Sequence, residues 1–328
     1  MKRLLSGIKP TGELTLGNYI GAIRQFVQMQ KDYESFVFVA DLHALTVYND
    51  PKELKTRIKH LMGVYLACGL DPEYTTLFLQ SENMYHANLS WVLECNSYMG
   101  ELSRMTQYKD KSKGKNNESI SCGLFTYPAL MAADIMIYDA DVVPVGVDQK
   151  QHVELARNIA ERFNNKYGET FKVPDVVNPK EGAKIYDLQN PTKKMSKTDE
   201  LGKGCIMLLE PVENAKKKIM SAVTDSENSI YYDKENKPGI SNLLVIYSSL
   251  ENVSIEDAVE KFKNANYGEF KKAVAESVGV FLEDLQSKFN KIVESGMIEE
   301  VLDKSNEKVR KIAEAKVKEV FEKVGVGR

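Results

Sequence analysis

Short apolar runs alternate with segments of helical apolar spacing along the first half of the chain. The apolar runs predict buried strands at 3–6, 35–40, 75–79 and 142–145, although Pro144 argues against a central place for the last one. Helices are predicted at 17–31 and at 51–68, the second one starting at Asn49-Asp50-Pro51. Apolar strands that alternate with helices indicate an α/β fold whose parallel sheet is covered on both faces.

The pattern changes after the third predicted strand. Residues from about 82 to 140 exceed what one connection between strands needs, and 109–121 are polar, so we expect a helical insertion with a polar loop. After about residue 204 the spacing is helical, and the last helix has apolar residues at helical intervals from Val309 to Val324. The parallel sheet and its insertion are therefore expected to be followed by an all-helical C-terminal domain.

Composition is typical of a globular protein that can bury a core, with 43% hydrophobic and 28% charged residues. The N-terminus has too few apolar residues for a signal peptide, and the longest uncharged run, 119–133, is too short and polar to span a membrane. The four cysteines form no C-x-x-C pair, which favours buried free thiols in a reducing compartment over a metal site. We expect a cytoplasmic protein without membrane association.

Charge does not by itself indicate a nucleic-acid partner. The formal net charge is −3, whereas proteins that hold nucleic acid by charge alone are normally basic. An RNA would have to meet local patches, such as Lys216-Lys217-Lys218 or the tail 304–328, in which eight Lys/Arg face four Glu. Taken alone, each patch is better explained as a solvated helix face.

Residues 6–21 form a predicted strand, a loop with glycines and a helix start. In a parallel sheet, ligands bind beyond the carboxyl ends of the strands, where a helix N-terminus offers N–H groups to an anion. Gly12, Gly17 and Gly21 would let a ring or phosphate approach the backbone closely. The spacing is neither G-x-G-x-x-G nor a Walker A loop, so a plain connection explains it equally well.

Residues 191–199 gather cations and hydroxyls on a short segment without periodicity. Such a loop can neutralise the charge that develops on a pyrophosphate leaving group. Composition alone favours a solvated basic loop.

The order of residues in both segments resembles the class I aminoacyl-tRNA synthetases. Residues 194–198, Lys-Met-Ser-Lys-Thr, are similar to the KMSKS loop, and 15–18, Thr-Leu-Gly-Asn, to the HIGH motif in the variant form of tryptophanyl-tRNA synthetases. Residues 131–135, 145–152, 187–199 and 224–226 also fit that family, so that the resemblance covers essentially the whole chain. It implies a Rossmann-like sheet and an enzyme that uses ATP with bound Mg²⁺ to form tryptophanyl-adenylate, then charges tRNA(Trp).

By this resemblance, fourteen residues are expected to bind ATP: Lys9, Pro10, Thr11, Gly17, Asn18, Gly146, Val147, Asp148, Ile185, Lys194, Met195, Ser196, Lys197 and Thr198. Lys194, Lys197 and Thr198 would also act on the phosphates, joined by Lys111, for which a solvated lysine is an equal alternative. No protein metal site is implied. Three positions depart from the family pattern: Lys9 stands for the usual Gln, Thr198 for Ser, and Val147 for an acidic residue.

Asp134 is the expected acceptor for the indole N–H of tryptophan. From sequence alone, a surface carboxylate or one paired with a lysine is the simpler explanation. A charge-assisted bond to the indole is worth about 1.5–3 kcal/mol, and its absence can reject phenylalanine by roughly 10⁴–10⁵. The resemblance adds six further pocket residues, of which His43 could equally be structural: Gly7, His43, Tyr127, Met131, Val143 and Gln149.

The resemblance also implies an assembly and a division of labour. A homodimer is expected, with tRNA across both subunits, and the apolar stretch 91–99 is either its interface or internal core. We expect a catalytic domain at 1–200, with its insertion at about 82–140 and its KMSKS-type loop at 194–198. A helical anticodon-side domain at 201–290 and C-terminal helices at 291–328, packed back toward the catalytic domain, would follow.

Three rival functions share part of this pattern. A tyrosyl-tRNA synthetase has the same fold and loop, but the Asp134 context favours indole over phenol. A paralogue that binds RNA or tryptophan for regulation would be expected to lose the loop lysines, which are present here. A small-molecule nucleotidyltransferase would not need the long helical C-terminal half.

Overall fold

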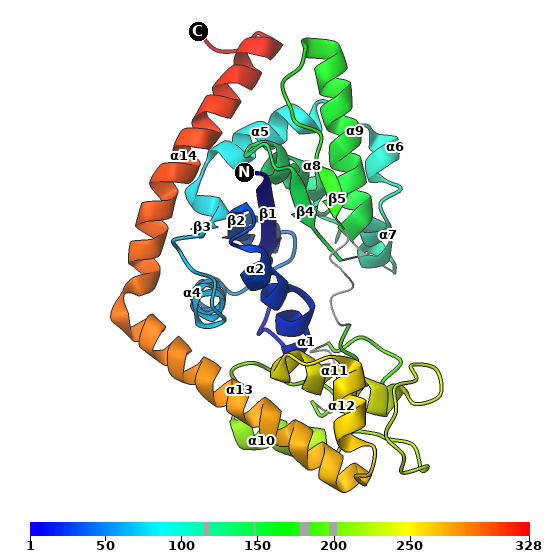
Figure 1. Ribbon diagram of the computed structural model, residues 1–328. Coiled ribbons are helices and arrows are strands. Elements are labelled where there is room, and N and C mark those ends of the chain that lie inside the picture. Colours follow the sequence, from blue (N-terminus) through cyan, green and yellow to red (C-terminus); the bar gives the residue numbers. More distant parts are fainter. Residues whose placement is uncertain (115–118, 147–148, 178–183, 197–201) are drawn as a thin grey trace.

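The computed structural model describes residues 1–114, 119–146, 149–177, 184–196 and 202–328 (Figure 1). Its elements are β1 (Arg3–Ile8), α1 (Leu16–Asn18), the π-helical turn η1 (Tyr19–Ile23), α2 (Arg24–Met29), β2 (Glu34–Val39), α3 (Asp41–Ala44), α4 (Pro51–Ala67), β3 (Thr75–Leu79), the 3₁₀ turn η2 (Gln80–Glu82), α5 (Tyr85–Glu94), α6 (Met99–Leu102), α7 (Thr106–Ser112), α8 (Cys122–Met136), β4 (Val142–Pro144), α9 (Lys150–Tyr167), β5 (Asp175–Val177), α10 (Val212–Met220), α11 (Pro238–Glu251), α12 (Ile255–Phe262), α13 (Tyr267–Ser295) and α14 (Met297–Val324).

The described strands form one parallel sheet in the order β3-β2-β1-β4-β5, with β1 at its centre. All four predicted strands are present. Pro144 ends β4 and therefore interrupts no further pairing, which explains how a proline enters a strand between two neighbours. The short β5 was not predicted. The α/β class and the parallel sheet followed by long helices are confirmed.

Side chains of β2 alternate between two hydrophobic cores, one on each face of the sheet. Val37 and Val39 pack in the core that includes α4, α11 and α13. Phe36 and Phe38 pack in the core formed with α5, α8, α9 and α14. Burying a side chain of this size stabilises the fold by about 1.5–3 kcal/mol, so both layers hold the sheet rigid where its strands end.

The predicted helix at 17–31 is broken into three pieces. Thr15 caps α1, because its hydroxyl accepts the Asn18 N–H at 3.1 Å while the Asn18 side-chain oxygen accepts the Thr15 N–H at 2.9 Å. The π-helical turn η1 follows and widens the helix before α2 continues it. Wider turns of this kind are frequent at functional sites, and this one lies directly after the HIGH-like segment.

The C-terminal half forms a helical body, and its last helix returns to the sheet (Figure 1). Helix α13 ends at Gly296, whose φ of 78° suits glycine and lets the chain turn into α14. Along α14, Val309, Ala313 and Val317 are buried in the core beside Phe36. Lys308 pairs with Glu34 of β2 at 3.1 Å. The helix therefore packs against β3 and α5, beside the start of β2.

The four cysteines are all free, but the expectation that they are buried is wrong for two of them. Cys95 and Cys122 are exposed at the end of α5 and at the start of α8. Across the described residues, no His, Cys, Asp and Glu side chains gather into a group that could hold a metal ion. None of the described helices has the length and apolar character to cross a membrane.

Candidate active site

Polar residues follow the carboxyl ends of the three neighbouring strands β1, β2 and β3. Asp41, after β2, accepts the Ser81 backbone N–H at 2.9 Å and its hydroxyl at 2.5 Å, which joins the ends of β2 and β3. Gly7 lies in the central strand and is nevertheless exposed, so the sheet is open to solvent above it. A Cβ at Gly7 would lie 2.7 Å from the Phe38 ring, too close for any larger residue.

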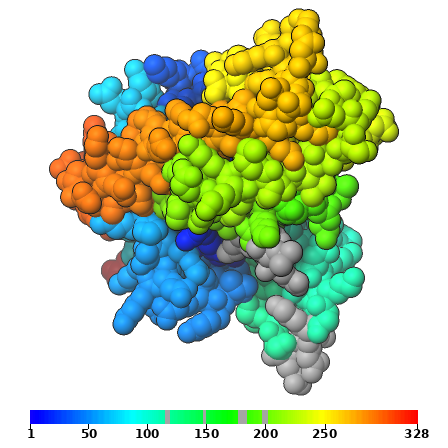
Figure 2. Space-filling model, turned by 90° about the horizontal axis from the view of Figure 1, so that it is seen from below, coloured from blue at the N-terminus to red at the C-terminus, as the bar shows by residue number. Residues whose placement is uncertain are grey.

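The opening faces the region between the sheet and the helical body. Seen from below, residues from near the N-terminus lie in a recess, dark blue between the orange to yellow-green helices and the rest of the chain (Figure 2). Parallel sheets bind their ligands at this edge because the loops and helix N-termini converge there.

Asp134 of α8 lies at one wall of the opening and is 2% exposed. Its Oδ2 is 2.8 Å from His43 Nε2, and its Oδ1 lies 2.7 Å from both His86 Nδ1 and Gln80 Nε2. Burial acts to raise the pKa of this carboxyl, but hydrogen bonds from His43 and His86 lower it to about 2. The buried carboxylate is therefore ionised and can only accept hydrogen bonds.

Tyr127 links the Asp134 side of the opening to a pair of lysines. The edge of its ring meets the His43 ring at 6.1 Å between centroids, and its hydroxyl lies 2.7 Å from His152 Nε2. Lys111 Nζ lies 5.6 Å from the centre of the same ring, a cation–π distance. The predicted residues His43, Tyr127 and Lys111 are thus close together.

Lys9 follows β1 directly and donates from Nζ to the Thr46 hydroxyl at 2.9 Å. Burial, and then the positive charge of Lys111, lower the pKa of Lys9 to about 8. An anion bound beside these two lysines would offset the repulsion that lowers the pKa of Lys9.

The HIGH-like segment and the first half of the KMSKS-type loop are in contact. Residues 185–195 form a hairpin in which the Met195 N–H donates to the Ile185 carbonyl at 3.0 Å, with Tyr186 opposite Lys194. A Cβ at Gly17 would lie 3.5 Å from Met195 Cβ and 3.6 Å from Ile185 Cβ. Lys194 and Ser196 are exposed beside buried Met195. Val147, Asp148, Lys197 and Thr198, also predicted to bind ATP, lie outside the described residues.

A family model for tRNA synthetases class I (W and Y) matches residues 1–283. The tryptophan–tRNA ligase of Oceanobacillus iheyensis is 52% identical over 328 residues, covering 100% of both chains. The tryptophan–tRNA ligase of Bacillus subtilis is 51% identical over 325 residues, 99% of this chain and 98% of the relative. The chain belongs to the tryptophanyl-tRNA synthetases. Its activity is that of a tryptophan–tRNA ligase, and the sequence-based identification is confirmed.

Solved structures agree with this family. The tryptophanyl-tRNA synthetase of Mycoplasma pneumoniae has a TM-score of 0.90 and 37% identity, covering 100% of this chain and 98% of that one. The Campylobacter jejuni tryptophanyl-tRNA synthetase, solved with ADP and tryptophan, has a TM-score of 0.83 and 35% identity, covering 99% and 100%. A tyrosyl-tRNA synthetase from Archaeoglobus fulgidus, at 21% identity and a TM-score of 0.69, shares the fold alone.

Within this synthetase, the other predicted tryptophan-binding residues lie on the elements around the opening. Val143 is buried in β4, and Met131 is half-buried on α8, one turn before Asp134. Gln149 is half-buried at the start of α9, where its N–H donates to the carbonyl of exposed Gly146 at 2.9 Å. Pro10 is buried, while the Thr11 N–H bonds the Lys9 carbonyl at 2.9 Å.

Sequence reasoning missed the residues that hold Asp134. Gln80 and His86 contact its carboxylate, and Tyr138 lies 2.7 Å beyond His86, hydroxyl to Nε2. One signal was available: Gln80 is the polar residue that follows a buried strand, as Asp41 and Lys9 do. Nothing in the spacing of His86 or Tyr138 indicates this contact.

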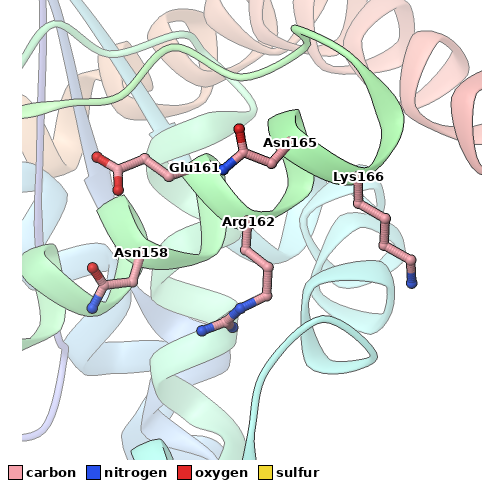
Figure 3. A pocket seen from close by; sticks show the side chains of 5 residues that line it. All are labelled: Asn158, Glu161, Arg162, Asn165 and Lys166. Carbon is pink, nitrogen blue, oxygen red and sulfur yellow. The ribbon is translucent and has the colours of Figure 1, made fainter.

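Two other features lie apart from this site: the basic run on α10 and a surface hollow on α9. Of the basic run on α10, Lys216 pairs with Glu276 and Lys218 with Glu210 at 2.6 Å, which favours a structural role for both. A surface hollow on α9 is lined by Asn158, Glu161, Arg162, Asn165 and Lys166 (Figure 3). It shares no residue with the opening above β1, so we assign it no part in the reaction.

Proposed function

We propose that tryptophan and ATP react at the opening above β1, and that the ionised carboxylate of Asp134 selects the substrate. A carboxylate has about four acceptor positions, and three are taken by His43, His86 and Gln80. The indole N–H would take the fourth. Charge-assisted bonds of this kind are worth about 1.5–3 kcal/mol, and a buried carboxylate left short of one penalises substrates without the N–H.

The rest of the amino-acid pocket is proposed to surround the ring. Gly7 would form its floor, with the Phe38 ring filling the space that a larger side chain at this position would need. His43, Tyr127, Met131 and Val143 would enclose the indole, and Gln149 would meet the polar end of the amino acid. The Campylobacter jejuni structure with ADP and tryptophan supports a shared site for nucleotide and amino acid in this fold.

ATP is proposed to lie along the HIGH-like segment and to enter with Mg²⁺ on its phosphates. The polar groups described at this edge are chiefly lysines, hydroxyls and backbone amides, which suit phosphate oxygens better than a bare divalent cation. The proposed contacts are Lys9, Pro10, Thr11, Gly17, Asn18, Gly146, Val147, Asp148, Ile185, Lys194, Met195, Ser196, Lys197 and Thr198. Asp148 would accept from a ribose hydroxyl.

In the reaction, the tryptophan carboxylate attacks the α-phosphorus, and the bond to pyrophosphate breaks. The nucleophile is already ionised, so no general base is needed, and catalysis rests on positioning and charge stabilisation. Lys111, Lys194, Lys197 and Thr198 would stabilise the charge on the leaving pyrophosphate. Closure of the loop 194–198 would gate the step. The 3′-terminal ribose hydroxyl of tRNA(Trp) then attacks the activated carbonyl and releases AMP.

We further propose a homodimer that binds tRNA across both subunits. Met84, Trp91, Tyr98 and Met99 are each at least 60% exposed on and beside α5 and α6, so an internal core explains Val92 and Leu93 but not these four side chains. The Arg162 guanidinium stacks on Tyr98 at 4.1 Å, which holds part of this surface in place. In this scheme 1–200 is catalytic, 201–290 faces the anticodon, and 291–328 braces the catalytic domain.

The test is ATP–pyrophosphate exchange with tryptophan and phenylalanine on the wild type and on Asp134→Asn. The amide keeps the size of the carboxylate but removes its charge, so we expect the preference for tryptophan to fall by about 10- to 100-fold. The second measurement is the KM for ATP, which should change little because the nucleotide contacts lie elsewhere. A preference that stays at the wild-type value would show that Asp134 does not select the substrate.

A further inference from the structure

A chain of buried hydrogen bonds leads from Asp134 into the core. His86 Nδ1 contacts Asp134 Oδ1 at 2.7 Å, and His86 Nε2 contacts the Tyr138 hydroxyl at 2.7 Å. The Asn83 side-chain N–H donates to that hydroxyl at 3.1 Å. His86 and Tyr138 are fully buried, and Asn83 is 2% exposed. The proposed reaction uses none of these three side chains.

Backbone contacts orient Asn83, and the proton positions of Tyr138 and His86 are then inferred from it. The side-chain Oδ1 of Asn83 accepts the Tyr85 N–H at 3.3 Å, so its amide nitrogen must point at Tyr138. Asn83 thus donates to the hydroxyl, and among the described residues His86 Nε2 is the acceptor left for the hydroxyl hydrogen. A neutral His86 that accepts at Nε2 carries its proton on Nδ1, where it donates to Asp134.

The orientation of the Gln80 amide follows in the same way. Its oxygen accepts the Leu42 N–H at 3.2 Å, so its nitrogen donates to Asp134. The two donors to Asp134 Oδ1 are His86 Nδ1 and Gln80 Nε2. Each side chain is oriented by a second hydrogen bond, His86 by the Tyr138 hydroxyl and Gln80 by the Leu42 N–H. The chain also reaches α14, since Asn83 donates to the Val309 carbonyl at 3.4 Å.

From this geometry we propose that His86 and Tyr138 are specificity-determining positioning residues for tryptophan, acting through Asp134. Tyr138 fixes the tautomer and ring orientation of His86, and His86 fixes Oδ1 so that the carboxylate presents its free acceptor position to the indole N–H. Without the hydroxyl, the imidazole can turn a C–H toward Asp134 and release the carboxylate. The inference rests on the proposed role of Asp134 and extends it to residues that never touch the substrate.

The test measures ATP–pyrophosphate exchange for Tyr138→Phe with two substrates. One is tryptophan, and the other is 3-benzothienylalanine, in which sulfur replaces the indole N–H at nearly constant shape. We expect kcat/KM for tryptophan to fall about tenfold, the size of one lost hydrogen bond. The value for the analogue should hold, and so should the KM for ATP. The ratio of the two amino-acid values is therefore the readout.

A damaged fold would lower both amino-acid values together and leave their ratio unchanged, an outcome that overturns the proposal. Tyr65→Phe is the matched control, because Tyr65 is equally buried and its hydroxyl contacts the backbone of Phe38, at 3.5 Å, and of Ile8 rather than Asp134 or His86. An equal fall of the ratio in Tyr65→Phe would also overturn it. Should Tyr138→Phe not fold, His86→Asn keeps an N–H near Asp134 and breaks the same link.

Asp134→Asn separates this inference from the function on which it rests. If Asp134→Asn lowers the ratio and Tyr138→Phe does not, the role of Asp134 stands and that of His86 and Tyr138 is wrong. If Asp134→Asn leaves the ratio unchanged, the indole contact itself is wrong.

Discussion

Two residues at the carboxyl edge of the sheet, Asp134 and Lys9, have pKa values that their surroundings lower for different reasons. Asp134 is buried among donors, which hold its pKa at about 2. Lys9 is partly buried beside another cation, which lowers its pKa to about 8 from 10.5. The first group is therefore negatively charged at neutral pH. The second changes its charge within the working range of most enzymes.

Lys9 should make ATP binding sensitive to alkaline pH. Its charge is present below about pH 8 and lost above it, so the KM for ATP should rise about threefold or more from about pH 7.5 to about pH 9. Lys9→Gln is the matched control, since it carries the residue usual in the family and should show no such rise. The measurement is the pH profile of exchange at saturating tryptophan, and equal profiles would contradict the role of Lys9.

The lowered pKa of Lys9 also determines how its contribution to the free energy of unfolding changes with pH. The unfolded chain keeps the Lys9 proton up to about pH 10.5, whereas the folded protein releases it near pH 8. Because the unfolded state binds more protons in that window, the contribution of Lys9 to the free energy of unfolding rises with pH between these values. A bound phosphate would reverse this, since it holds the proton on the folded protein.

At the scale of elements, the sequence predicted the helices and strands that have a clear local pattern. It missed the contacts that depend on how distant elements pack together. The strand at 75–79 was found from its apolar run, and helix α4 from its start signal at Asn49-Asp50-Pro51. The three-residue β5 offers too little pattern, and the π-helical turn at Tyr19–Ile23 has the apolar spacing of an ordinary helix. His86 meets Asp134 only because α5 and α8 pack together, which no local signal records.

A buried lysine ties three elements of the helical body together. Lys237, 1% exposed at the start of α11, donates from Nζ to Asp225 at 2.9 Å, to Glu227 at 2.8 Å and to the Tyr267 hydroxyl of α13 at 2.9 Å. Asp225 belongs to the Thr-Asp-Ser segment that also fits the family. The cluster therefore fixes this segment against α11 and α13.

Lys237→Met should destabilise the helical body by about 1–3 kcal/mol, because it leaves the partly buried Asp225 carboxylate without its cation. Burial acts to raise the pKa of Asp225, but bonds from Tyr267 and Lys237 lower it to about 2. Its stabilising effect is present above the unfolded value near 3.9 and is lost as pH falls toward 2. Urea unfolding at about pH 7 and pH 3 should show a smaller difference between the two proteins at the lower pH. A constant difference would contradict the pairing.

At the scale of the whole molecule, the chain passes from the sheet to the helical body and returns along α14. The hairpin 185–195 touches the HIGH-like segment, and α14 packs in the core beside Phe36. The hairpin thus borders the carboxyl edge of the sheet, whereas α14 pairs with Glu34 at the amino end of β2. The exposed apolar residues Met84, Trp91, Tyr98 and Met99 on the insertion have no partner surface within the described chain that covers them.

If that surface joins two subunits, light scattering should give a mass near twice 37.0 kDa for the wild type. Trp91→Glu combined with Met99→Glu places two like charges in the interface and should yield the single-chain mass, because an unpaired buried charge costs several kcal/mol. Val280→Glu is the control, since Val280 is 59% exposed on α13, away from α5 and α6, and this variant should stay dimeric. A double variant that keeps twice the chain mass would place the interface elsewhere.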